Sequence, residues 1–152
     1  MEQLPRSKGC FVCGNSDDNP RSLGLTIFWN DEEQRTEIPI LPNNTWCGYE
    51  GVVHGGIIAS VFDDAMAWAI RRESGSWAVT GEMSVRYLRP VLAGTRYVVE
   101  GRVEKRSGRR ISTVAVMKDD DGKKVAEANG LFLKIRQKEA PGNEGEEEIP
   151  PM

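Results

Sequence analysis

Histidine is almost absent from this chain of 152 residues, which contains His54 alone, and cysteine is scarce, with three residues. A single histidine excludes any site built from several imidazole ligands. An odd number of cysteines does not complete a disulfide framework, so we expect Cys10, Cys13 and Cys47 to be free thiols. No uninterrupted apolar run is long enough to span a membrane, and the first residues lack the apolar stretch of a signal peptide. The sequence therefore predicts a cytoplasmic protein without a membrane partner.

Two of the cysteines have the spacing Cys-x-x-Cys, over residues 10–13. Two thiolates at this spacing can share one zinc ion, with Cys47 and His54 as conceivable completing ligands. The chain has no second Cys-x-x-Cys, however, and a tight turn at Cys13-Gly14-Asn15 explains the spacing as well. We therefore predict neither a bound metal nor another cofactor.

The net charge of −3 is unevenly distributed. Residues 137–152 hold five glutamates and one lysine, so they carry −4, and residues 1–136 carry +1. The C-terminal stretch is predicted to be a disordered acidic tail. The remainder is expected to form an N-terminal segment over residues 1–20 and one globular domain over residues 21–136. Its nearly neutral charge, without a spread of basic and aromatic residues, argues against a nucleic-acid partner.

The hydrophobic pattern of the globular domain begins with two strands and one long helix. Residues 23–29 and 35–41 favour strands, with Pro39 at an edge or a bulge. A run from Gly56 to about Arg72 is apolar nearly all round and predicts a buried helix, which Gly75 ends.

An alternation of period two follows the helix and predicts a long strand. It places Met83, Val85 and Tyr87 on one face and Thr80, Glu82, Ser84 and Arg86 on the other. Residues 96–105, 110–118 and 123–135 complete the set of strands, separated by hairpin signals. One antiparallel sheet wrapped around one helix, an α+β fold, is the simplest packing of these elements.

Gly55 and Gly56 open the predicted helix. The unpaired N–H groups of a first helical turn suit a carbonyl oxygen that becomes negative in a transition state. The same glycines can instead serve only to let the helix pack closely on the sheet, and both interpretations stay open. For His54, at the helix start, we favour a structural hydrogen bond over the role of a base.

Two adjacent carboxylates, Asp63 and Asp64, interrupt the apolar helix and point about 100° apart around its axis. One is a candidate general base or nucleophile, and the other is expected to be solvated or interfacial. The alternative is a buried carboxylate bonded to a strand hydroxyl such as that of Thr80. Gly56 and Asp63 lie about 10 Å apart along one helix. They can therefore act on one group only if they come from two subunits related by a two-fold axis.

Several motifs occur in a fixed order along the chain. They are Gly51-Val52-Val53-His54-Gly55-Gly56, then Asp63 nine positions after His54, then Thr80 followed by Val85-Arg86-Tyr87-Leu88-Arg89-Pro90. Together with Cys10-Phe11-Val12-Cys13-Gly14 and Leu23-Gly24-Leu25, they resemble the PaaI-like hotdog-fold acyl-CoA thioesterases. The resemblance covers roughly residues 10–135.

The resemblance implies a curved antiparallel sheet around one long central helix, in a homodimer or a dimer of dimers that binds acyl-CoA at the subunit interface. It implies that the Gly55 N–H polarises the thioester carbonyl, that Asp63 acts as base or nucleophile and that Thr80 orients water or the carboxylate. His54 joins this catalytic set. The candidate substrate-binding residues are Gly56, Asp64, Arg89, Arg109 and Arg110, the arginines as partners of the CoA phosphates.

One position departs from the pattern of the family. Some members carry Asn or Gln six residues before the histidine, where this chain has Gly48, so that polar group is either absent or replaced by Asn44 or Thr45. The departure favours an alternative function, a non-catalytic acyl-CoA-binding or sensing protein of the same fold. A hotdog hydratase or dehydratase is disfavoured, because the single histidine already lies at the helix entry.

Overall fold

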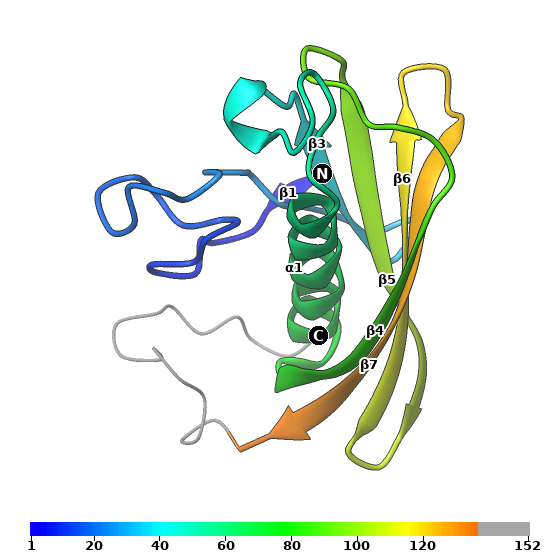
Figure 1. Ribbon diagram of the computed structural model, residues 1–152. Coiled ribbons are helices and arrows are strands. Elements are labelled where there is room, and N and C mark those ends of the chain that lie inside the picture. Colours follow the sequence, from blue (N-terminus) through cyan, green and yellow to red (C-terminus); the bar gives the residue numbers. More distant parts are fainter. Residues whose placement is uncertain (137–152) are drawn as a thin grey trace.

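One helix lies against a curved antiparallel sheet in the computed structural model, which describes residues 1–136 (Figure 1). Helix α1 spans Gly55–Ser74, and a short 3-10 helix, η1, spans Asn44–Trp46. The strands are β1 (Glu2–Gln3), β2 (Phe28–Asn30), β3 (Arg35–Ile40), β4 (Trp77–Tyr87), β5 (Tyr97–Ser107), β6 (Arg110–Asp119) and β7 (Lys124–Ile135). Their order in the sheet is β1-β2-β3-β5-β6-β7-β4. The predicted α+β hotdog architecture is confirmed, whereas the predicted acidic tail lies outside the described residues.

Helix α1 is the centre of the core. The sheet covers one side of it, and the N-terminal segment, residues 1–20, lies on the other side once it has left β1 (Figure 1). The helix begins after His54, and it ends at Gly75, whose φ of 71° is left-handed and whose N–H donates to the Arg71 carbonyl. Glycine adopts this conformation without a Cβ penalty. The predicted buried helix and its end are thus confirmed.

The helix and the sheet come closest at Ala65. The Thr36 hydroxyl, fully buried on β3, donates to the Ala65 carbonyl at 2.7 Å. On β5, a Cβ at Gly101 would lie 2.7 Å from the same carbonyl group. Because no side chain fits there, Gly101 permits the close packing of the helix on the sheet.

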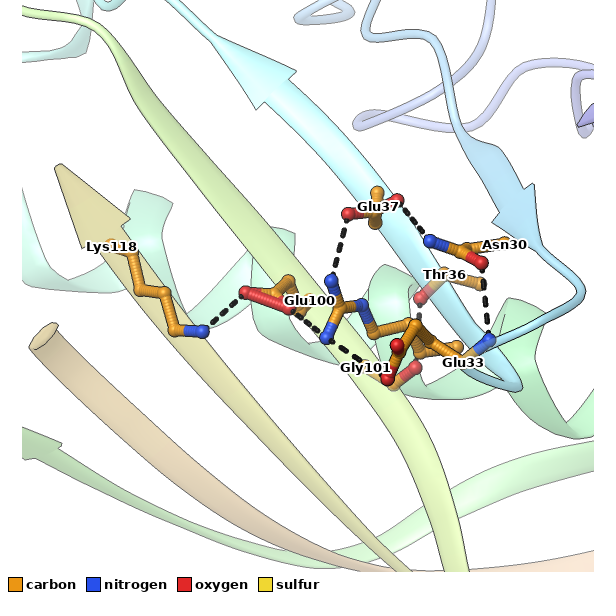
Figure 2. A network of polar contacts seen from close by, with 8 residues as sticks. Asn30, Glu33, Thr36, Glu37, Glu100, Gly101 and Lys118 are labelled. Carbon is orange, nitrogen blue, oxygen red and sulfur yellow. Dashed lines mark hydrogen bonds and ion pairs between the residues drawn. The ribbon is translucent and has the colours of Figure 1, made fainter. Parts of the chain in front are cut away.

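An ionic network on the outer face of the sheet joins three neighbouring strands (Figure 2). Glu100 on β5 is only 5% exposed and accepts from Arg35 on β3 at 2.8 Å and from Lys118 on β6 at 2.9 Å. Arg35 also contacts Glu37 at 3.2 Å. A carboxylate this deeply covered needs such cationic partners, and the network links the side chains of β3, β5 and β6, which are already paired through their backbones.

The region before β3 differs from the sequence prediction. β2 begins at Phe28 rather than at residue 23, because the N–H groups of Leu23 and Leu25 donate to Phe11 and Val12 of the N-terminal segment. These long-range bonds, like β1 and η1, leave no periodic signal in the sequence. Pro39 agrees with its predicted edge position, since the pairing of β2 with β3 stops at Glu37.

Over residues 1–136, no helix combines the length and the apolar character that a membrane crossing requires. The expected cytoplasmic location remains a prediction.

Candidate functional site

A bulge in β4 turns Thr80 toward helix α1. The register of β4 on β7 shifts between Thr80 and Glu82, so that Thr80 pairs with Phe132 and Glu82 pairs with Leu131. Directly paired residues share one face of a sheet, and Phe132 is buried in the core. The prediction that Thr80 shares a face with Glu82, Ser84 and Arg86 is therefore wrong. It assumed an uninterrupted alternation, which the extra residue Gly81 breaks.

This reorientation joins Thr80 to the first of the two helical carboxylates. The Thr80 Oγ1 donates to Asp63 Oδ1 at 2.5 Å. Thr80 is exposed on β4, one of the two edge strands of the sheet, and Asp63 is half-buried on α1. The Thr80 hydroxyl thus orients the Asp63 carboxylate toward the outer edge of β4. Among residues 1–136 of one protomer, no further strand pairs with this edge.

The start of α1 leaves one backbone donor free. His54 Nδ1 accepts the Gly56 N–H at 2.8 Å, and the His54 carbonyl accepts the Ile57 N–H at 3.0 Å. In residues 1–136, the Gly55 N–H donates no hydrogen bond. The His54 side chain thus makes the expected structural hydrogen bond as a cap of the helix. Its membership of the catalytic set remains a prediction. Of the two glycines, Gly55 is the one whose donor is available to a ligand.

Tyr87, at the far end of β4, contacts the same helix start. Its hydroxyl donates to the Gly55 carbonyl at 2.6 Å, and a Cβ at Gly55 would lie 3.3 Å from the Tyr87 ring. Partial burial raises the pKa of Tyr87 above its usual value near 10, so the hydroxyl stays protonated and able to donate. The sequence analysis placed Tyr87 on the same face as Met83 and Val85 but did not predict this contact.

A cavity of about 490 Å³ opens at the start of α1. Its lining is largely apolar and comprises Gly48, Tyr49, Val52, Val53, His54, Gly55, Ile58, Tyr87, Leu88, Arg89, Pro90 and Val91. The helix N-terminus therefore faces a space large enough for part of an organic ligand. The dipole of α1 places partial positive charge at this end.

The cavity gathers only some of the predicted site residues. Arg89 lines it, whereas Arg109 and Arg110 lie at the β5–β6 hairpin, at the opposite end of the sheet (Figure 1). Neither Asn44 nor Thr45 is among the lining residues, and the Thr45 hydroxyl donates to Asn43 instead. Neither of the two residues that we considered as replacements for the polar group at Gly48 thus lines the cavity.

Asp63 does not line the cavity either. Eight residues separate it from Gly55, which corresponds to about 12 Å along a helix. A protomer therefore presents two half-sites on α1, a backbone donor at its start and a carboxylate two turns further on.

Asp64 points away from both half-sites, toward the N-terminal segment. Its Oδ1 lies 3.5 Å from Cys10 Sγ. Burial raises the pKa of the Asp64 carboxyl well above its usual range. The structure thus separates Asp64 from the cavity to which we assigned it, and Asp63 is the carboxylate oriented toward the open edge.

The family of the chain follows from this fold together with a sequence comparison. The model of the thioesterase superfamily matches residues 50–126, which contain the helix, the bulge and the cavity-lining residues from Val52 onward. The chain belongs to the thioesterase superfamily. This agrees with the resemblance drawn from its motifs.

Individual relatives support the same assignment. The chain is 29% identical to acyl-coenzyme A thioesterase THEM4 of Xenopus laevis over 123 residues, which cover 80% of this chain and 54% of that protein. The chain thus spans about half the length of the curated relatives it matches.

Two solved structures share the fold at lower identity. The PaaI protein from the Escherichia coli phenylacetic acid degradation operon has a TM-score of 0.69 and 22% identity, covering 76% of this chain and 83% of that one. The smu.793 protein of Streptococcus mutans, bound to acetyl CoA, has a TM-score of 0.64 and 16% identity, covering 88% and 87%. The predicted PaaI-like fold is thereby confirmed.

Proposed function

We propose that this protein hydrolyses an acyl-CoA thioester to a carboxylic acid and coenzyme A. The observation that carries the proposal is the free Gly55 N–H at the positive end of α1, facing the cavity. A thioester carbonyl placed there accepts this hydrogen bond, which strengthens as negative charge develops on the oxygen. The name of the THEM4 relative and the acetyl CoA in the smu.793 structure support the choice of substrate.

Asp63 supplies the second chemical group. As a base, its carboxylate takes a proton from water while the water oxygen attacks the carbonyl carbon. As a nucleophile, the carboxylate attacks the carbonyl carbon itself, and water then hydrolyses the resulting anhydride. In both cases the carbon–sulfur bond breaks and the CoA sulfur leaves as a thiolate. The Thr80 hydroxyl orients the carboxylate for either step.

The active site is proposed to form between two copies of the chain. The separation of about 12 Å along α1 is too long for Gly55 and Asp63 of one protomer to contact the same carbonyl. Antiparallel helices across a two-fold axis bring the Gly55 of one protomer toward the Asp63 of its partner. The unpaired edge of β4, next to Thr80, supports this pairing. The assembly is then a homodimer or a dimer of dimers.

Arg89 is the basic residue that the cavity offers to the phosphates of CoA. Arg109 and Arg110 lie at the other end of the protomer, so they contact the nucleotide only if they come from another subunit.

The test is the release of free thiol from acetyl-, hexanoyl-, decanoyl- and phenylacetyl-CoA. We expect turnover of at least one substrate, and a loss of about 100-fold or more in Asp63→Asn at equal folded concentration. Asp120→Asn is the matched control, because it makes the same change on the exposed β6–β7 turn. Full activity in Asp63→Asn would exclude Asp63 as base or nucleophile.

The second candidate function is non-catalytic binding of acyl-CoA. It is favoured by Gly48, which leaves the cavity without the polar side chain that some family members carry. A wild-type protein without turnover, whose melting temperature rises with acyl-CoA, would establish this function in place of hydrolysis.

A further inference from the structure

Two cysteines and a carboxylate meet where the N-terminal segment crosses α1. One ligand atom each from Cys10, Cys13 and Asp64 lies within 4.8 Å of the others. Cys10 Sγ and Asp64 Oδ1 are 3.5 Å apart. In a tetrahedral zinc site, with a Zn–S bond of about 2.3 Å and a Zn–O bond of about 2.0 Å, sulfur and oxygen are also separated by roughly 3.5 Å. Cys10 and Asp64 therefore already have the spacing of two zinc ligands, and Cys13 lies within 4.8 Å of both.

The loop that carries the cysteines presents Cys10 as a ligand. The N–H groups of Val12 and Cys13 donate to Cys10 Sγ at 3.3 and 3.4 Å. The Gly14 N–H donates to the Cys10 carbonyl at 2.9 Å, and a Cβ at Gly14 would lie 2.5 Å from that oxygen. Two backbone donors stabilise the thiolate, which is the form that binds metal. The predicted tight turn is thus present, and it is itself a suitable metal-binding loop.

Asp64 provides an independent observation. Its Oδ2 is buried and has no hydrogen-bond partner among the residues that the structure describes. A buried carboxylate oxygen without a partner is costly, and a cation bound beside it removes that cost. Cys13 is itself buried, only 1% exposed, whereas Cys10 and Asp64 are half-buried.

We propose that Cys10, Cys13 and Asp64 together bind one zinc ion. The fourth ligand is a water molecule in the adjoining cavity of about 110 Å³, whose lining includes Cys10, Asp64, Arg71 and Trp77. Two thiolates, one carboxylate and Zn²⁺ carry a total charge of −1, which the guanidinium of Arg71 on the cavity wall counterbalances. The indole N–H of Trp77 is buried and without an acceptor in residues 1–136, so it can donate to that water.

The site differs from the one considered in the sequence. Cys47 and His54 do not complete it, because His54 Nδ1 caps Gly56 and neither residue belongs to this group. The third ligand is instead Asp64, 54 positions from Cys10 in sequence. The ion would link the N-terminal segment to the central helix beside Asp63, and the proposal does not depend on thioesterase activity.

The experiment measures metal binding by the full chain. Purified without chelator, the protein is expected to contain about one zinc per chain by elemental analysis. Replacing zinc with Co²⁺ is expected to produce the charge-transfer absorption of a cobalt–thiolate bond. Cys10→Ser and Cys13→Ser should greatly weaken this absorption. Cys47→Ser, the matched control, should retain it.

Asp64→Asn tests the third ligand with little change in side-chain size. It keeps the proposal testable if the cysteine variants do not fold. We expect its zinc affinity to fall at least about tenfold. Zinc chelation should lower the melting temperature of the wild type and of Cys47→Ser by about 5 °C or more, and that of Cys13→Ser much less. Absence of both zinc and the cobalt–thiolate absorption at micromolar metal would overturn the proposal. An equal loss of the cobalt–thiolate absorption in Cys47→Ser and Cys10→Ser would also overturn the proposal.

Discussion

Thr80 Oγ1 and Asp63 Oδ1 lie 2.5 Å apart, across the contact between the edge strand β4 and the central helix. The bond exists because the register shift at Gly81 brings Thr80 onto the face of its neighbour Phe132. A side chain on the sheet thereby sets the orientation of a side chain on the helix.

Thr80→Val keeps the shape of the side chain and removes the hydroxyl. Because the Asp63 carboxylate then loses its orienting donor, we expect kcat to fall about tenfold or more. The free energy of unfolding should change by no more than about 1.5 kcal/mol. Thiol-release kinetics and urea denaturation measure the two effects. Thr80→Ser, which restores the donor, should recover most of the activity, and an undiminished rate in Thr80→Val would show that the bond is not needed.

Gly55→Pro removes the proposed carbonyl-binding N–H with little disturbance of the helix. Proline is well tolerated at the first helical position, and His54 already has the extended conformation that a following proline requires, with φ −60° and ψ 131°. We expect a loss of about 100-fold or more in kcat/KM. Gly55→Ala is the matched control, since it adds the same Cβ near Tyr87 and retains the N–H.

Mixing two inactive proteins tests whether the site is shared between subunits. A dimer of one Gly55→Pro chain and one Asp63→Asn chain contains one site with both native groups. Co-refolded mixtures should therefore recover up to about a quarter of wild-type activity, since random pairing makes about half of the dimers mixed. Each protein alone should stay inactive. No recovery in mixtures that are shown to form mixed dimers would place the complete site within one chain.

His54→Ala tests the cap against a catalytic role. Loss of the bond from the Gly56 N–H to Nδ1 should lower the free energy of unfolding by about 1 kcal/mol, as for other helix caps. His54→Asn supplies a new capping oxygen and is expected to recover most of that stability and nearly full turnover. A stable but inactive His54→Asn would instead make the imidazole part of the chemistry. Urea denaturation followed by thiol-release assays distinguishes these results.

The bond from Tyr87 to the Gly55 carbonyl predicts a specific response to alkali. Burial raises the pKa of Tyr87 in the folded state above its usual value near 10, so the folded chain holds this proton more tightly than the unfolded chain. Its contribution to stability is complete below pH 10 and is lost as the pH rises through the folded-state value. The urea midpoint of wild type minus that of Tyr87→Phe should thus be constant from pH 7 to 9 and decrease above pH 10.

The central helix could be predicted from the sequence because its signals are local. An apolar run, a glycine beyond its last turn and two glycines at its start mark Gly55–Ser74 closely. The unpaired N–H groups at its start could also be predicted, since they follow from helix geometry. The assignment of the Gly55 N–H to a carbonyl came only from the family resemblance.

Contacts between distant segments could not be predicted in the same way. The N–H groups of Leu23 and Leu25 bind the N-terminal segment, and Asp64 lies beside Cys10, which is 54 positions away. Two adjacent carboxylates with the same local context therefore have different surroundings, Asp63 at the sheet edge and Asp64 under the N-terminal segment. Their surroundings differ because the fold brings a different distant segment next to each carboxylate.

The extra residue in β4 also affects how this chain is compared with its relatives. An alignment that runs through the strand without a gap at Gly81, against a sequence lacking the bulge, matches Thr80 to a residue on the opposite face. A survey based on such an alignment would count the hydroxyl partner of Asp63 as missing in proteins that have one. Aligning by cross-strand partner, here Phe132 for Thr80, avoids that error.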